Sequence, residues 1–420
     1  MPNLHRLIKS YTEKNIVVRI LIGMILGIAL GLSAKYTNLE FEADLVNFAK
    51  LLGDLFISSL KSVAPILVFI LVANSILSNN FSNSKGLKRV LFLYLLGTFF
   101  GGLTGVVFSY IFPVTLALNV PADLNFKNPG SLIVVLQNLL FNIVDNPIHA
   151  LMNANYIGIL AWAIILGIML RNSNESTKHF FTDLAKAITK IVRIIIQFAP
   201  FGIFGLICIS VYSTGLNVLS SYGKIILLLV SAMLFLALII NPIIVLFYLK
   251  KNPYPLVITC LRESGITAFF TRSSAANIPV NIALAKKLNL DEELYPISIP
   301  LGATINMGGA SVVIAIMSIS AAFSLGIHPD FTSAILLSLV ATIGACGASG
   351  VAGGSLMLIP LACSLFGIGD DIAMQVVAIG FIIGVIQDSL ETAINSSTDI
   401  LFTAVASYTT NATTPTNTNI

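Results

Sequence analysis

Long apolar runs separated by short polar stretches dominate the first 250 residues. A membrane-spanning helix needs about 20 predominantly apolar residues. Runs of this kind lie at about 16–34, 51–78, 90–115, 131–170 (interrupted), 184–214 and 221–249. Backbone polar groups inside a bilayer must be satisfied within their own segment, so these runs predict helices. The pattern therefore predicts six spans in this part of the chain.

The pattern changes after residue 250. Two further apolar segments, at about 253–285 and 331–366, are interrupted at their centres by small and polar residues (TRSSAANIP at 271–279, GACGASGVAGGS at 344–355). Gly, Ser and Pro weaken a helix, and each half-segment of about 14–16 residues is too short to span. We therefore expect two re-entrant hairpins whose tips are buried in protein or line a wet cavity.

One full-length apolar helix follows each hairpin, at about 295–323 and 371–405. Basic residues flank the first hairpin and acidic residues or a histidine flank the second, so the two are expected to enter from opposite sides. The flanking residues are Lys250, Lys251, Lys286 and Lys287, and then His328, Asp330, Asp370 and Asp371. Paired interrupted segments of opposite orientation indicate a midplane substrate site in a secondary transporter. A channel with re-entrant loops would give a similar outline.

Composition excludes several functional classes. Of the 420 residues 56% are hydrophobic and only 10% are charged, whereas soluble domains carry about 25% charged residues. A soluble enzyme is therefore excluded, and the net charge of +4 is too small and scattered for a nucleic-acid-binding surface. The chain is predicted to lie in membrane lipid, with no nucleic-acid partner.

Charge also sets the orientation. Basic residues cluster before the first span, between the second and third, and after the interrupted fourth, and such clusters mark the cytoplasmic side. Both termini are therefore expected in the cytoplasm. The polar stretch 1–14 and the long apolar run after it predict no cleavable signal peptide. Four widely separated cysteines predict neither a disulfide framework nor a zinc site.

The last helix carries polar residues where lipid should allow none. Counting about 100° per residue, Asp388, Glu391, Thr392, Asn395 and Asp399 fall on a stripe about 100° wide. A carboxylate in the bilayer core costs at least roughly 2.5–3.5 kcal/mol. A solvated face outside the membrane is the alternative, but the opposite face is continuously apolar. The stripe predicts a site for a hard cation such as sodium and for an amino group.

Two other features supply partners for this stripe. The penultimate helix is interrupted at 302–310 (GATINMGGA), where an unwound turn would free carbonyls for a cation, although a small-residue packing seam would look similar. Arg272, at the tip of the first hairpin, must find a carboxylate or a wet cavity. We expect it to pair with Glu391 or Asp388.

Two other functional classes fit the sequence less well. A cation pore could use re-entrant loops and an acidic stripe, but Asp388 beside Glu391 suits an ammonium group better than a ring repeated around an axis. An intramembrane hydrolase would need a base near Ser273, Ser274 or Ser355, and no histidine lies near a span centre. No phosphate-binding G-x-x-x-x-G-K-[ST] motif is present, so ATP drive within this chain is not expected, and neither is enzymatic activity.

The succession of a serine-rich hairpin, an NM-G- helix break, a GV-GG hairpin and a D…T..N…D helix resembles the dicarboxylate/amino acid:cation symporters, the glutamate-transporter family. The segment FAPFG at 198–202 also resembles that family, and the likeness runs to about residue 405. It implies an all-α polytopic membrane protein with eight transmembrane helices, two oppositely oriented re-entrant helical hairpins and a homotrimeric assembly. It also implies an elevator-type movement of a 251–407 transport core against 1–250 scaffold helices, some of which could belong to the core. The Thr- and Asn-rich composition of 408–420 separately predicts a disordered cytoplasmic tail.

The resemblance assigns roles to individual positions. Asp388 matches the residue that holds the substrate's amino group, Asn395 one that holds its carboxylate, and Ser274 with 350–354 the hairpin positions that close over the substrate. The expected substrate-binding residues are Arg272, Ser273, Ser274, Gly350, Gly353, Asp388, Glu391, Thr392 and Asn395.

Sodium sites follow in the same way. Asp399, Asn306 and the carbonyls of Gly302 and Asn395 match one site, and Thr304 with the second hairpin matches another. The family's third site uses an aspartate and a threonine where this chain has Gly308 and Ala310. We therefore expect fewer co-transported sodium ions.

The main departure from the family pattern is Glu391. Acidic-substrate members carry an arginine there, and at an effective dielectric near 20 the reversal is worth roughly several kcal/mol against an acidic side chain. The neutral-substrate bacterial sodium/serine–threonine symporters are the nearest group. This predicts sodium-coupled import of small neutral L-amino acids, serine and threonine foremost, across a bacterial inner membrane. The alternatives are a symporter for another small amino acid or for a dicarboxylate, or a cation channel.

Overall fold

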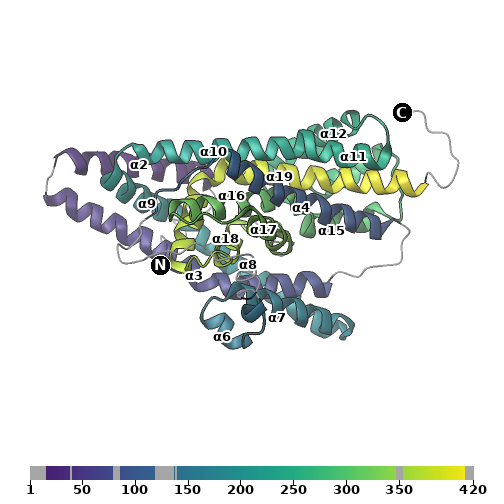
Figure 1. The fold of residues 1–420 in the computed structure, drawn as a ribbon, viewed down its shortest axis with the longest axis horizontal. Coiled ribbons are helices and arrows are strands. Elements are labelled where there is room, and N and C mark those ends of the chain that lie inside the picture. The colour runs from purple at the N-terminus through teal and green to yellow at the C-terminus, as the bar shows by residue number, and fades with distance from the viewer. Residues whose placement is uncertain are drawn as a thin grey trace, which may run out of the picture.

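The computed structural model describes residues 16–37, 40–78, 86–118, 137, 140–346 and 353–411. Every regular element in these residues is helical (Figure 1), which confirms the predicted all-α class. Six of these helices are long and apolar enough to cross a membrane, or seven if one bent pair counts as a span. The protein is thus polytopic, while the expected total of eight spans stays a prediction.

The first group of helices packs through small residues. α2 (Ile16–Thr37) and α3 (Glu40–Ser78) both pack on α9 (Ala199–Thr214). A Cβ atom on Gly27 would lie 2.6 Å from the Phe204 carbonyl oxygen, so only a glycine allows these backbones to approach. α3 begins eleven residues before the apolar run starts at 51, and Glu42 in its first turns accepts a hydrogen bond from Ser33 (2.6 Å).

Most of the remaining helices of this group pack on α3: α7 (Tyr156–Met169), α8 (Glu175–Gln197) and the 3₁₀ turn η1 (Leu170–Asn172) contact it, and α6 (Pro147–Met152) packs on α7. α6, α7 and η1 lie along the lower edge of Figure 1. The run at 184–214, expected as one span, forms two helices, α8 and α9, which are bent by 49° to each other; they are the bent pair that makes seven spans when counted as one. Pro200, in the first turn of α9, has no amide hydrogen to donate into α8, so a new helix starts there.

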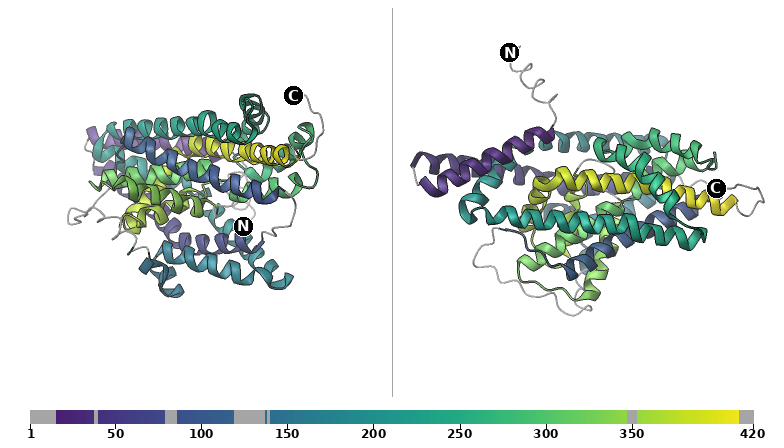
Figure 2. Two further views of the ribbon diagram at one scale, coloured as in Figure 1. Left: turned by 45° about the vertical axis from the view of Figure 1, so that its right-hand side comes forward. Right: turned by 90° about the horizontal axis from the view of Figure 1, so that it is seen from above.

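α4 (Leu87–Ile111) and α10 (Asn217–Phe235) pack with the second half of the chain. α10 continues through a π turn, η2 (Leu236–Ile240), into α11 (Asn241–Leu249), and it runs beside the last helix in Figures 1 and 2. A Cβ atom on Gly101 of α4 would lie 2.3 Å from the Gly308 carbonyl oxygen. α4 therefore touches the backbone where the penultimate helix is interrupted.

The first hairpin is broken where the sequence predicts. Its inward arm comprises α12 (Tyr254–Cys260), the π turn η3 (Leu261–Gly265) and α13 (Ile266–Thr271), and its return arm is α14 (Ser274–Lys287). Arg272, between the arms, has a φ of 51°, in the left-handed region that non-glycine residues seldom adopt. The side-chain oxygen of Ser273 caps α14 by accepting from the Ala276 amide (3.2 Å).

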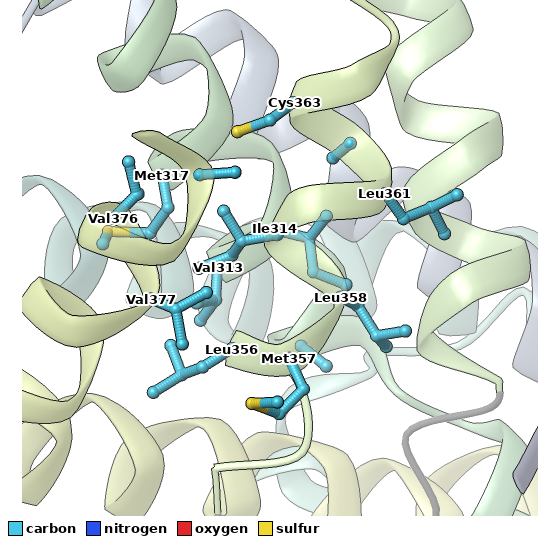
Figure 3. Packing of buried hydrophobic residues seen from close by; sticks show 14 of the residues in the cluster. Val313, Ile314, Met317, Leu356, Met357, Leu358, Leu361, Cys363, Val376 and Val377 are labelled. Atoms are coloured by element: carbon cyan, nitrogen blue, oxygen red, sulfur yellow. The ribbon is translucent and has the colours of Figure 1, made fainter. Parts of the chain in front are cut away.

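The second hairpin consists of α17 (Phe331–Ala345), a 3₁₀ turn η4 (Leu356–Leu358) and α18 (Ile359–Ser364). Residues 347–352 of its tip lie outside the described residues. Its return arm packs against α16 (Gly308–Ser324) and α19 (Asp370–Asn411), as Figure 3 shows. The labelled side chains of this core are Val313, Ile314, Met317, Leu356, Met357, Leu358, Leu361, Cys363, Val376 and Val377.

The two full-length helices also follow the prediction, with one correction. α15 (Tyr295–Ile305) and α16 are separated by Asn306 and Met307, inside the predicted interruption. α19 runs to Asn411, so 408–411, expected in the disordered tail, are helical. The Tyr408 hydroxyl donates to the Leu288 carbonyl (3.0 Å), which holds this last turn against the first hairpin.

Candidate functional site

The polar stripe of α19 is buried inside the protein. Asp388, Glu391, Thr392, Asn395 and Asp399 are each at most 7% exposed, so a solvated outer face is excluded. The stripe contacts the interruption between α15 and α16, Arg272 and Gly353 of the two hairpins, and Tyr94 in the N-terminal half of α4. These elements together form one polar region in an otherwise apolar bundle.

Asp388 forms an ion pair with Arg272 of the first hairpin. The Nη2 and Nε atoms of the guanidinium lie 2.6 and 2.7 Å from the same carboxylate oxygen, Oδ2. The Gly353 amide of the second hairpin donates to the other oxygen, Oδ1 (3.3 Å), with a φ of 74° at this glycine. Of the two partners expected for Arg272, the structure thus selects Asp388, which both hairpins contact.

Glu391 lies one turn further along α19 and is held by neutral donors. The Ser355 hydroxyl of the second hairpin donates to Oε2 (2.7 Å), and the Gln387 side-chain amide donates to the same oxygen. Both donors are almost fully buried, at 1% and 2% exposure. Because they cannot exchange this acceptor for bulk water, they fix the position of the carboxylate.

A second polar group surrounds Asn306, in the interruption between α15 and α16. Its amide nitrogen donates to the Asp399 carboxylate (2.8 Å), the Thr398 hydroxyl (2.8 Å) and the Asn395 carbonyl (3.1 Å). Among the described residues, neither the Asn306 carbonyl oxygen Oδ1 nor the Asp399 oxygen Oδ2 has a hydrogen-bond partner, and both are buried. Buried oxygens without donors are the ligands that a hard cation takes.

Glycines shape the space around this group. A Cβ atom on Gly302 would lie 2.6 Å from Asp399 Oδ1, and one on Gly309 would lie 2.9 Å from the Glu391 carbonyl oxygen. The Gly309 amide donates to the Asn395 side-chain oxygen (2.8 Å). The interruption therefore lets the α15–α16 backbone approach α19 more closely than any larger residue would permit.

The remaining expected residues lie nearby with weaker involvement. Ser274 is 3% exposed at the start of α14, while the Thr304 hydroxyl donates to the Leu301 carbonyl (2.7 Å) and the Thr392 hydroxyl to the Asp388 carbonyl (2.7 Å). Ser273 uses its side chain as the cap described above. Gly350 lies outside the described residues.

Sequence reasoning missed four residues of the site. The Tyr94 hydroxyl of α4 lies 3.0 Å from the Asp399 carbonyl oxygen, and the Thr98 hydroxyl accepts from the Met307 amide (3.1 Å). Ser355 and Gln387 are the donors to Glu391. Only Gln387 carried a local signal, because residues four apart on a helix are neighbours; the others depend on tertiary packing.

The family comparison covers nearly the whole chain. Residues 16–409 match the sequence profile of the sodium:dicarboxylate symporter family. The matched region contains both hairpins, the interruption between α15 and α16, and the full polar stripe of α19. The resemblance inferred from the motifs is thereby confirmed. The chain belongs to the sodium:dicarboxylate symporter family, whose members couple the membrane transport of dicarboxylates or amino acids to sodium.

Proposed function

We propose that this protein imports small neutral L-amino acids, serine and threonine foremost, by sodium symport across a bacterial inner membrane. The observation that carries the proposal is Glu391, a buried carboxylate at the position where acidic-substrate members of the family carry an arginine. Its two neutral donors add no positive charge to this place.

We assign the ammonium group of the substrate to Asp388. The guanidinium of Arg272 already occupies this carboxylate through two short contacts, which supports a preference for a nitrogen cation at this point. A substrate ammonium group would displace Arg272. Ser274 and the amide of Asn395 would take the substrate carboxylate.

Charge then excludes acidic substrates. A second carboxylate on the substrate would lie beside Glu391, and at about 4 Å with an effective dielectric near 20 the repulsion is about 4 kcal/mol. That energy corresponds to roughly a thousandfold loss of affinity. Aspartate and glutamate are therefore poor substrates, whereas a neutral side chain avoids the penalty.

Sodium would occupy the oxygens around Asn306 and Asp399. The two oxygens that have no hydrogen-bond partner in the described part of the chain, with the carbonyls of Gly302 and Asn395, make an all-oxygen ligand set with one negative charge. Thr304 with the second hairpin would form another site. Gly308 and Ala310 contribute no side-chain oxygen, so we infer fewer coupled ions than in members that carry an aspartate and a threonine there.

The packing suggests how such a transporter would move. α2, α3, α8 and α9 pack with one another and would form the scaffold of a trimer, whereas α4 packs with α16, α17 of the second hairpin and α19 and would move with the core. Lys61 of α3 bridges the two groups, with its ammonium nitrogen 2.6 Å from Asp371 and 3.7 Å from Asp370 at the start of α19. An elevator movement would have to break this contact.

The test is uptake of radiolabelled L-serine into liposomes that contain the purified protein, with and without an inward sodium gradient. Unlabelled threonine, alanine and aspartate serve as competitors. Sodium-driven uptake that threonine blocks and aspartate does not supports the proposal. Block by aspartate would refute the charge argument at Glu391, and serine uptake that no gradient drives would refute symport.

A further inference from the structure

We propose that Oε1 of Glu391 accepts a hydrogen bond from the β-hydroxyl of the substrate, and that Ser355 and Gln387 are the positioning residues that present it. This inference rests on the proposed function, because it takes an amino acid bound at Asp388 as given. It adds a hydroxyl subsite, which would separate serine and threonine from alanine.

The contacts of the carboxylate are one-sided. Ser355 and Gln387 both donate to Oε2, and within the described part of the chain no hydrogen bond engages Oε1. An ionised carboxylate has about four lone-pair sites and can only accept. Two of these sites are thus satisfied by the protein, and the other oxygen is left available in a side chain that is 7% exposed.

The donors determine which way this free oxygen faces. Gln387 approaches from the preceding turn of α19, and Ser355 approaches from the second hairpin. Since both bind one oxygen, any rotation of the carboxylate except the half-turn that exchanges its two equivalent oxygens would break two hydrogen bonds. A carboxylate held on one side in this way is preorganised to receive a donor on the other, because no free energy is spent on reorienting it when the substrate binds.

The spacing of Asp388 and Glu391 suits a small hydroxy amino acid. Side chains three apart on a helix have Cβ atoms about 5–6 Å apart on one face. The ammonium and hydroxyl groups of serine are attached to neighbouring carbons, so one molecule can donate to both carboxylates. Alanine would leave Oε1 of this largely buried side chain without a donor, and sites built to bind a hydroxyl reject analogues that lack it.

A competition series on the wild-type protein tests the hydrogen bond directly. Serine, alanine and 3-fluoro-L-alanine each compete with labelled serine; fluorine is close to a hydroxyl in size but cannot donate. A hydrogen bond to a charged group predicts that serine binds about tenfold or more tightly than either analogue. If 3-fluoro-L-alanine competes as well as serine, the inference is overturned.

Variants test the two positioning residues. In Ser355→Ala and Gln387→Leu, we expect the serine-to-alanine ratio of uptake efficiency to fall by about threefold to tenfold, with sodium-driven alanine uptake retained. A general structural defect would lower both uptakes together and leave the ratio unchanged. Ser364→Ala is the matched control, because its hydroxyl lies in the same hairpin and donates only to the Leu361 carbonyl (2.8 Å).

The outcomes separate this inference from the proposed function. If the wild type takes up serine and alanine equally well on a sodium gradient, symport of neutral amino acids stands and the hydroxyl subsite is refuted. If it takes up neither, both are refuted. An unchanged ratio in Ser355→Ala and Gln387→Leu, with strong selectivity in the wild type, refutes the positioning roles.

Discussion

Removal of Arg272 should show how much its ion pair with Asp388 contributes to stability. The guanidinium contacts Asp388 through two nitrogens at 2.6 and 2.7 Å, and the side chains are 22% and 5% exposed. Removing one partner of a buried ion pair costs about 3–5 kcal/mol, because the other charge is left uncompensated. Arg272 is partly exposed, so we expect Arg272→Ala to lose about 3 kcal/mol.

The assay is thermal unfolding of the purified protein in detergent, with and without serine in the presence of sodium. In the wild type the substrate ammonium group must displace the guanidinium, whereas in Arg272→Ala it fills an empty place. The variant should therefore unfold at a lower temperature without serine and gain more from serine than the wild type does. Arg262→Ala is the control, because its pair with Glu263 (3.3 Å) is exposed and is worth about 0–1 kcal/mol.

Transport gives a second readout of the same perturbation. Arg272→Ala should abolish net serine uptake, since Asp388 and Glu391 would then place two uncompensated carboxylates on consecutive turns. Adding Glu391→Gln removes one of these charges and should partly restore uptake. The reasoning is refuted if Arg272→Ala keeps wild-type stability and uptake, or if the double variant does no better than the single one.

Three further expectations follow from the site and the scaffold. Asp399→Asn removes the one formal charge beside Asn306 and should weaken the sodium dependence of serine binding at least tenfold, measured as the sodium concentration that gives half-maximal stabilisation. Gly205→Val should leave little folded protein in size-exclusion chromatography, because even a Cβ atom would lie 1.9 Å from the Ala49 carbonyl oxygen. In Gly223→Ala the added Cβ atom would meet no atom within 4 Å, so the variant should fold and gain up to about 1 kcal/mol of stability from helix propensity. Equal yields of the two glycine variants would contradict the close α3–α9 packing.

Local pattern was enough to predict most elements. Apolar runs of sufficient length mark spans, and small polar centres mark the interruptions at Arg272 and at Asn306, because each depends on residues adjacent in the chain. The limits of elements were less predictable. The early start of α3, the bend before α9 and the helical end of α19 depend on a proline and on contacts with other segments.

The sequence by itself determined the all-α class, the two broken hairpins, the polar stripe of α19 and the family, because periodicity and motifs are properties of neighbouring residues. Only the tertiary structure decided which carboxylate Arg272 meets, since the partners are 116 positions apart. The same holds for Ser355 on Glu391 and Tyr94 beside Asp399, 36 and 305 positions apart. A stripe of carboxylates indicates a charged site, but the division that we propose, into ammonium, cation and hydroxyl positions, depends on which distant donors pack against each oxygen.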